Sequence, residues 1–249
     1  MEIFLVIIFG LVIGSFLNVC ICRIANEESI AFPPSHCTNC GYELRVKDLI
    51  PVLSYVLLGG ICRGCKEKIS IQYPIVEILN SILYVAIYLK FGFTLNLFKF
   101  CLLASLLIVI GIIDLQTKNV YNSTIVFGVV SGLIFLGLEW LETRVIPWNY
   151  ITGAFIGFLV IYLIVILTHG MGEGDIDIAL ICGLFLGIKG VLVTLFISVV
   201  LGGLVATGIL VLKLKDKKAE IAFGPYLAIG GLIACLYGNS IIDFYLKLF

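Results

Sequence analysis

Charged residues are scarce in this chain of 249 residues. Lys, Arg, Asp and Glu make up 13% of the sequence, and 16 basic residues balance 16 acidic ones. Binding a nucleic acid needs a concentrated basic face, so we expect no nucleic-acid partner. Hydrophobic residues make up 61% of the chain, and the mean hydropathy is +1.17. These values lie outside the range of soluble domains and predict a polytopic protein of the lipid bilayer.

Histidine is also scarce, because only His36 and His169 occur. With these two residues we find no convincing Ser–His–Asp set for nucleophilic catalysis. His36 is expected to be a surface residue. His169 lies beside a predicted helix end, where a cation is favourable, and is expected to have a capping role.

The apolar runs predict an all-α membrane protein, since about 20 helical residues cross the hydrocarbon core. Glu2 stands where a signal peptide has basic residues, so we expect the first run to remain as an anchor. The sixth run is short and continues into the seventh through Ile188-Lys189-Gly190. The eight candidate transmembrane helices are 3–21, 74–90, 98–115, 121–139, 150–168, 175–188, 190–212 and 225–246.

The positions of Lys and Arg predict the orientation in a cell (inner or plasma) membrane, because cytoplasmic flanks collect positive charge. With the N-terminus outside, eleven basic residues lie inside and five lie outside. The inside set is Arg23, Arg45, Lys47, Arg63, Lys66, Lys68, Lys118, Lys213, Lys215, Lys217 and Lys218, and the outside set is Lys90, Lys99, Arg144, Lys189 and Lys247. This orientation puts the 22–73 loop and the turns at 114–120 and 169–175 on the cytoplasmic side.

Three domains are expected: a first transmembrane helix at 1–21, a cytoplasmic four-cysteine loop at 22–73, and a seven-helix membrane domain at 74–249. The loop contains Cys37-x-x-Cys40 and Cys62-x-x-Cys65, with 21 residues between the pairs. That spacing is typical of a zinc ribbon, and four thiolates complete a closed, structural site. Disulfides or unlinked core cysteines remain the alternative, although a cytoplasmic location keeps thiols reduced. The other five cysteines are interpreted as small core residues.

Glycines recur at four-residue spacing within several predicted helices. Small residues at this spacing let helix backbones approach closely in lipid, where apolar burial gives no driving force for association. We interpret these pairs as packing surfaces. They are Gly10 and Gly14, Gly128 and Gly132, Gly153 and Gly157, and Gly183 and Gly187.

Acidic residues within membrane spans are costly and indicate function by default. Glu77 lies one turn into the second helix, where a structural role is expected, either at the positive end of the helix dipole or as the partner of a basic neighbour. Asp114 lies at the end of an apolar helix. The alternative to a functional role is that it is a solvated acid at the membrane interface. Asp175 follows Gly172 and Gly174 in a G-x-G-D turn, and a helix-capping Asp would look the same.

Together, Asp114 and Asp175 favour aspartyl peptide hydrolysis. Two carboxyl groups held close cannot both ionise cheaply, so one keeps a proton and acts as general acid while the other acts as general base. This chemistry needs neither a metal nor a nucleophilic side chain. Asp177, at i+2 from Asp175, points to a different helix face.

Seven stretches of the chain, taken in order, resemble the type IV prepilin peptidases, which are membrane aspartic proteases of the G-x-G-D type. The similarity covers nearly the whole chain. The stretches are GSFLNVCICRI at 14–24, PPSHCTNCG at 33–41, IPVLSYVLLGGICRGC at 50–65, YPIVEILN at 73–80, IIDLQTKNVYN at 112–122, GEGDI at 172–176 and FGPYLAIGG at 223–231.

The resemblance implies that Asp114 and Asp175 are the catalytic pair, that Gly172 and Gly174 form the active-site loop, and that the four loop cysteines bind zinc. It also implies cleavage of the basic leader of type IV pilin-like or pseudopilin precursors after a glycine, at the cytoplasmic face. Methylation of the new N-terminus with S-adenosylmethionine would follow. These activities belong to type IV pilus assembly and protein secretion.

The sequence departs from the family in two places. Val120-Tyr121-Asn122 replaces isoleucine-proline and a following acid or asparagine, and Asp177 stands where a lysine is common. No glycine-rich nucleotide loop marks a cofactor site, so no residues are assigned to S-adenosylmethionine. Two alternatives remain. An ion-coupled transporter would place its acids near the midplane, and a zinc-bearing scaffold would hold the carboxylates far apart.

Overall fold

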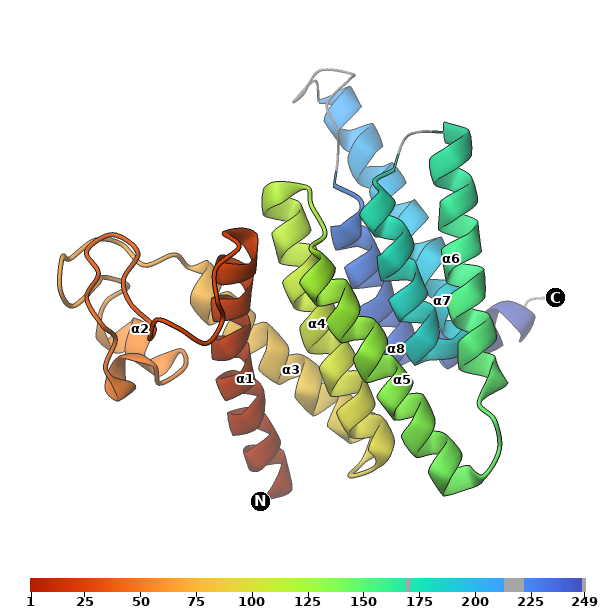
Figure 1. Cartoon of the computed structure of the whole chain (residues 1–249), viewed down its shortest axis with the longest axis horizontal. Coiled ribbons are helices and arrows are strands. Elements are labelled where there is room, and N and C mark those ends of the chain that lie inside the picture. Colours follow the sequence, from red (N-terminus) through yellow and green to blue (C-terminus); the bar gives the residue numbers. More distant parts are fainter. Residues whose placement is uncertain (169–170, 213–221, 248–249) are drawn as a thin grey trace. The chain divides into compact units, whose positions relative to one another are not determined.

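The computed structural model describes residues 1–168, 171–212 and 222–247, and the fold over these residues is all-α (Figure 1). Within them no strand forms, and two isolated β-bridges occur in the cysteine loop. The predicted fold class is confirmed. The helices are α1 (Glu2–Ala25), the 3-10 helix η1 (Val46–Asp48), α2 (Leu53–Leu57), α3 (Gln72–Phe91), α4 (Leu95–Thr117), α5 (Asn122–Thr143), α6 (Trp148–Thr168), α7 (Glu173–Val211) and α8 (Gly224–Lys247).

Seven helices in the described part of the chain are long and apolar enough to cross a membrane. The predicted helices 175–188 and 190–212 are the two parts of α7, which breaks at Gly187. Gly187 has φ 71° and ψ −173°, a backbone conformation that residues with a side chain rarely adopt. The Ile188 N–H beyond the break donates to Asn149 Oδ1 of α6 at 3.3 Å. The first part of α7 is therefore a separate short helix.

The chain divides into two compact units, Met1–Leu97 and Phe98–Phe249. In the first unit, α1 and α3 pack along each other. A methyl group at Gly10 would lie 2.6 Å from Ser81 Cα, and one at Gly14 would lie 2.6 Å from Glu77 Cα. The Asn80 and Ser81 side chains donate to carbonyls of α1 at 2.8 and 3.0 Å. Close backbone contact and interhelical hydrogen bonds thus join these helices.

In the second unit, α5, α6 and α8 each pack against α7. The contact with α6 is backbone to backbone: a methyl group at Gly183 would collide with the Gly153 carbonyl, and one at Gly157 with the Ala179 carbonyl. On the α5 side, Gly128 and Gly132 face Ile181 and Leu184. The glycine pairs therefore form packing surfaces, as the sequence predicts.

A buried ion pair connects three helices of the second unit. Lys99 of α4, with 1% of its surface exposed, lies 3.3 Å from Glu139 of α5. Its Nζ also lies 3.4 Å from the ring centroid of Tyr150 on α6. The sequence placed Lys99 near the outer end of the predicted helix 98–115. The structure buries it on α4, where a carboxylate and an aromatic face compensate the buried charge.

The close α6–α7 contact predicts that Gly183→Ala destabilises the second unit. The added methyl group has no space against the Gly153 carbonyl, and overpacking of this kind costs about 1–3 kcal/mol. Gly137→Ala in α5 is the matched control, because a methyl group there meets nothing within 4 Å. We expect thermal unfolding in detergent at a lower temperature for Gly183→Ala and an unchanged or slightly higher midpoint for Gly137→Ala. Equal midpoints for the two variants would contradict the packing described.

Candidate functional site

The two aspartates expected to react lie at helix ends in the second unit. Asp114 is three residues before the end of α4, and Asp175 is the third residue of α7. Their residues are 5% and 4% exposed, so neither is a solvated interfacial acid. The C-terminal end of α4 and the N-terminal ends of α7 and α8 meet at one end of this unit (Figure 1).

The Asp175 carboxylate is positioned by the turn that precedes it. The Gly172 N–H donates to Asp175 Oδ2 at 3.1 Å, and the Asp175 N–H donates to the Gly172 carbonyl at 3.1 Å. A methyl group at Gly174 would lie 2.6 Å from Val120 Cβ in the turn after α4. The second glycine of G-x-G-D therefore lets that turn approach α7. Val120 is one of the positions at which the sequence departs from the family pattern, and its side chain lies against Gly174.

Asp114 is held against the first residue of α8. The Gly224 N–H donates to the Asp114 carboxylate. A methyl group at Gly224 would lie 2.5 Å from Asp114 Oδ2, so this position has no room for a side chain. Sequence reasoning did not identify Gly224 as a site residue, and its only signal was its place in the FGPYLAIGG stretch. Asp114 Oδ2 is buried and has no hydrogen-bond partner in the described part of the chain.

Asp175 lies close enough to Asp114 for the two carboxylates to interact electrostatically. Asp177 does not take part in this pair. It is half-buried, and within the described residues it forms no hydrogen bond or ion pair. His169 lies outside the residues that the structure describes. Two buried carboxyl groups within electrostatic range of each other do not both ionise cheaply, which favours one protonated and one ionised group, the arrangement needed to activate a water.

The four loop cysteines form one cluster in the first unit. Their sulfur atoms all lie within 4.8 Å of one another, and two separations, Cys37 to Cys65 and Cys40 to Cys62, are 4.0 Å. Tetrahedral zinc, with Zn–S bonds of about 2.3 Å, needs sulfur atoms about 3.8 Å apart. The separations are too long for disulfides, and the thiols are free. The cluster can therefore hold a metal ion.

The two cysteine pairs occupy turns with the same backbone pattern. The Cys37 N–H donates to the carbonyl of residue 42 and the Cys62 N–H to that of residue 67, at 2.9 and 2.8 Å. In both turns the residue four positions after the first cysteine has a positive φ, 71° at Gly41 and 64° at Lys66. Lys66 thus takes the position that glycine takes in the first turn. This explains why Gly41 and Lys66 occupy corresponding places in the sequence.

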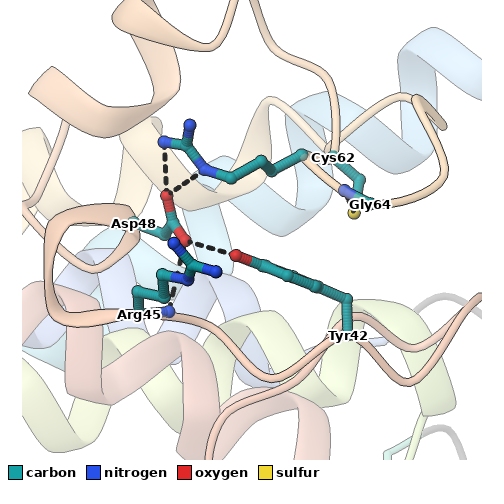
Figure 2. Close-up of polar contacts among 6 residues, drawn as sticks. Tyr42, Arg45, Asp48, Cys62 and Gly64 are labelled. Atoms are coloured by element: carbon teal, nitrogen blue, oxygen red, sulfur yellow. Dashed lines mark hydrogen bonds and ion pairs between the residues drawn. The ribbon is translucent and has the colours of Figure 1, made fainter.

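Backbone amides and one buried acid support the cluster. The N–H groups of Cys65 and Gly64 point at the Cys62 sulfur and lower its pKa to about 7, which favours the thiolate that metals bind. Figure 2 shows Asp48, which accepts hydrogen bonds from the Arg63 guanidinium at 2.7 and 2.9 Å and from Tyr42 at 3.4 Å. The bonds from Arg63 hold the pKa of Asp48 below its usual value. Asp48 therefore joins the two cysteine turns.

His36 and Glu77 have structural contacts. His36 Nδ1 lies 2.9 Å from the Pro34 carbonyl, and the ring is outside the sulfur cluster. Glu77 is 6% exposed and accepts a hydrogen bond from the Val52 N–H at 2.7 Å. Val52 has φ 60°, which is strained for a β-branched residue. Glu77 thus has a structural contact, which holds a strained turn of the cysteine loop against α3.

Comparison with protein families matches two models to the chain. Residues 8–91 match the bacterial peptidase A24 N-terminal domain, and residues 101–207 match the type IV leader peptidase family. The boundary between the matches coincides with the boundary between the two compact units, 1–97 and 98–249. The cysteine cluster lies in the first match, and Asp114 and Asp175 lie in the second.

Several curated proteins are similar over nearly the full length. A protein of Bacillus subtilis (strain 168) is 35% identical over 97% of this chain and 96% of its own length. Proteins of Aeromonas hydrophila and Pseudomonas putida are 31% and 32% identical, over 98% and 94% of this chain and 94% and 90% of their own lengths. All three are named prepilin leader peptidase/N-methyltransferase. No solved structure matches. On the two family models and these full-length similarities, the chain belongs to the type IV leader peptidase family of membrane proteases.

Proposed function

We propose that the chain is a membrane aspartic endopeptidase in which Asp114 and Asp175 cut the basic leader from type IV prepilin-like precursors after a glycine. The observation that carries this proposal is the pair of buried carboxylates at the ends of α4 and α7, which lie within electrostatic range of each other and of which Asp114 Oδ2 is unpaired in the described part of the chain. The names of the full-length relatives support the substrate class.

The reaction needs only these two carboxyl groups and water. One carboxylate takes a proton from the water as the water oxygen attacks the scissile carbonyl. The other carboxyl group donates its proton to the amide nitrogen as the carbon–nitrogen bond breaks. Gly174 and Gly224 leave no space for side chains beside the two aspartates. A glycine next to the cut bond suits such a narrow site.

The proposed enzyme lies in the cell membrane with its N-terminus outside and both the aspartates and the cysteine loop on the cytoplasmic side. The distribution of basic residues supports this orientation. A pilin-like precursor has an apolar helix in the membrane and a basic leader in the cytoplasm, so its cut bond lies at the interface. Aspartates at helix ends match that depth, because water reaches them there.

Methylation of the new N-terminus is the second proposed activity, and the names of the relatives support it. Bound S-adenosylmethionine would supply the methyl group. The carbon–sulfur bond would break with its electrons left on sulfur, and the amine nitrogen of the new N-terminus would form the new bond to carbon and lose a proton to water. The positively charged sulfonium makes this transfer favourable.

Zinc is the metal that we propose for the four-cysteine cluster, because four thiolates in tetrahedral spacing are its typical structural site. Cys37, Cys40, Cys62 and Cys65 would fill all four positions and leave none for water or substrate. The loop between α1 and α3 contains only η1 and α2 as regular structure. Metal binding would therefore supply much of its folding free energy.

An ion-coupled transporter is the weaker alternative. Acids that couple ions lie near the membrane midplane, at broken helices. Here the helix break at Gly187 is remote from both aspartates in sequence, and the aspartates lie at helix ends. A non-catalytic scaffold is disfavoured as well, because it gives no reason for two buried carboxylates to lie within electrostatic reach.

The proposed dyad predicts that Asp114→Asn and Asp175→Asn each lower cleavage of a prepilin precursor roughly a hundredfold to ten-thousandfold in reconstituted membranes. The amide keeps the shape of the side chain but cannot exchange a proton. Asp177→Asn is the matched control, because Asp177 lies two residues away and outside the pair. Unfolding temperatures verify that the variants fold. Cleavage at the normal rate by either dyad variant would exclude this assignment.

The proposed zinc site predicts about one zinc per chain, measured by elemental mass spectrometry of protein purified without added metal. Cys37→Ser and Cys62→Ser should each lose most of this zinc, and the loop should become sensitive to proteolysis, because an incomplete thiolate set binds zinc weakly. Cys22→Ser is the control, since Cys22 lies in α1 outside the cluster. Full zinc content in the Cys37 and Cys62 variants would contradict the assignment.

A further inference from the structure

The first unit contains a cleft between α1, the start of α3 and the cysteine loop. Its volume is about 570 Å³, which lies in the range of sites for small molecules. Asn18 and Arg23 of α1, Tyr73 and Glu77 of α3, and His36 of the loop are among the residues that line it. The proposed peptidase reaction uses none of them.

Asn18, which lines the cleft, carries an unpaired acceptor that is itself buried. Only 2% of the residue is exposed, and its Nδ2 donates to the carbonyls of Gly14 at 3.3 Å and Tyr73 at 3.0 Å. Two carbonyls on one side require the amide nitrogen there, so the oxygen must point the other way. Oδ1 has no hydrogen-bond partner in the described part of the chain. Leaving an acceptor buried and unpaired is costly, so a ligand that donates a hydrogen bond to it would be favoured.

Glu77 contributes a negative charge to the same cleft. Its carboxylate is buried and accepts hydrogen bonds from the Val52 N–H and the Ser15 side chain. Ion pairs within the described residues join Arg63 to Asp48 and Lys99 to Glu139, and neither includes Glu77. A buried carboxylate without a cation favours a positively charged ligand.

Arg23, the buried basic residue of the cleft, and Arg63 are already engaged, and Lys68 lines the cleft as an exposed residue. Arg23 donates to the carbonyls of Ser29, Pro33 and Pro34 at 2.9, 2.6 and 3.4 Å. Arg63 donates to Asp48. The buried groups that are left for a ligand are therefore an amide oxygen and a carboxylate. A ligand that fits them carries a positive charge and an N–H donor.

We propose that this cleft binds S-adenosylmethionine, with Glu77 facing its positively charged methionine portion and Asn18 Oδ1 accepting a hydrogen bond from one of its N–H groups. This molecule carries both features. Its sulfonium and ammonium groups are positively charged, and the amino groups at its two ends supply N–H donors. The inference rests on the proposed methylation and assigns its cofactor to named residues. It places the cofactor in the unit that contains the cysteine cluster.

Direct binding tests the assignment without a catalytic readout. Isothermal titration calorimetry of the full-length, zinc-loaded protein in nanodiscs, with S-adenosylmethionine as the titrant, gives the dissociation constant. We expect Glu77→Gln to weaken binding about tenfold or more, because the amide keeps the acceptor for the Val52 N–H but removes the charge. Asn18→Ala should weaken binding by a similar factor. Glu43→Gln is the control, since Glu43 is an exposed acid of the same loop that does not line the cleft.

The possible results separate this inference from the proposed function. If the unaltered protein does not bind S-adenosylmethionine, the proposed methylation fails and the cleft assignment fails with it. If the unaltered protein binds and both Glu77→Gln and Asn18→Ala bind equally well, methylation stands but the cofactor lies elsewhere. Zinc content, measured for each variant, shows that the loop remains folded, so a loss of binding in Glu77→Gln reports the charge.

Discussion

The backbone contact between α6 and the first part of α7 is the constraint on which the second unit depends. In lipid, apolar side chains gain little by leaving the hydrocarbon for one another, so helices associate through close packing and polar contacts. Gly153 and Gly183 bring the two backbones together, and Asn149 binds the Ile188 N–H at the Gly187 break. The short helix that contains Asp175 near its start is thus fixed along its length and at its far end. Its orientation determines where the carboxylate lies.

The buried ion pair of the second unit, Lys99 with Glu139, lies far from the aspartates. Lys99, paired with Glu139 and covered by Tyr150, lies 15 residues before Asp114 on α4, about 22 Å along the helix. Lys99 links α4 to α5 and α6, so a structural role explains why its charge is buried. The aspartates have no basic partner among the described residues, so structure alone gives no reason for their burial. This contrast supports a chemical role for the aspartates.

Much of the architecture could be predicted from the sequence because its signals are local. Apolar runs define spanning helices, glycine pairs at four-residue spacing indicate packing faces, and two C-x-x-C pairs indicate a shared metal. The proximity of Asp114 and Asp175 could not be derived in this way, because 61 positions separate them and only the tertiary fold brings the ends of α4 and α7 within electrostatic range. Three further features depend on backbone conformation or on partners far along the chain: the turn at Lys66, the proximity of Gly224 to Asp114, and the contact of Glu77 with Val52.

Two buried side-chain polar atoms lack a hydrogen-bond partner in the described part of the chain, Asn18 Oδ1 and Asp114 Oδ2. Each such atom costs about 1–3 kcal/mol, so a fold retains it where the unpaired group has a use. One lies in each compact unit, beside the cleft in the first and in the carboxylate pair in the second. Because the two family models divide the chain at the same boundary, each proposed chemistry has its own unit and its own unpaired acceptor. Loss of one site therefore need not remove the other, since no residue is shared between them.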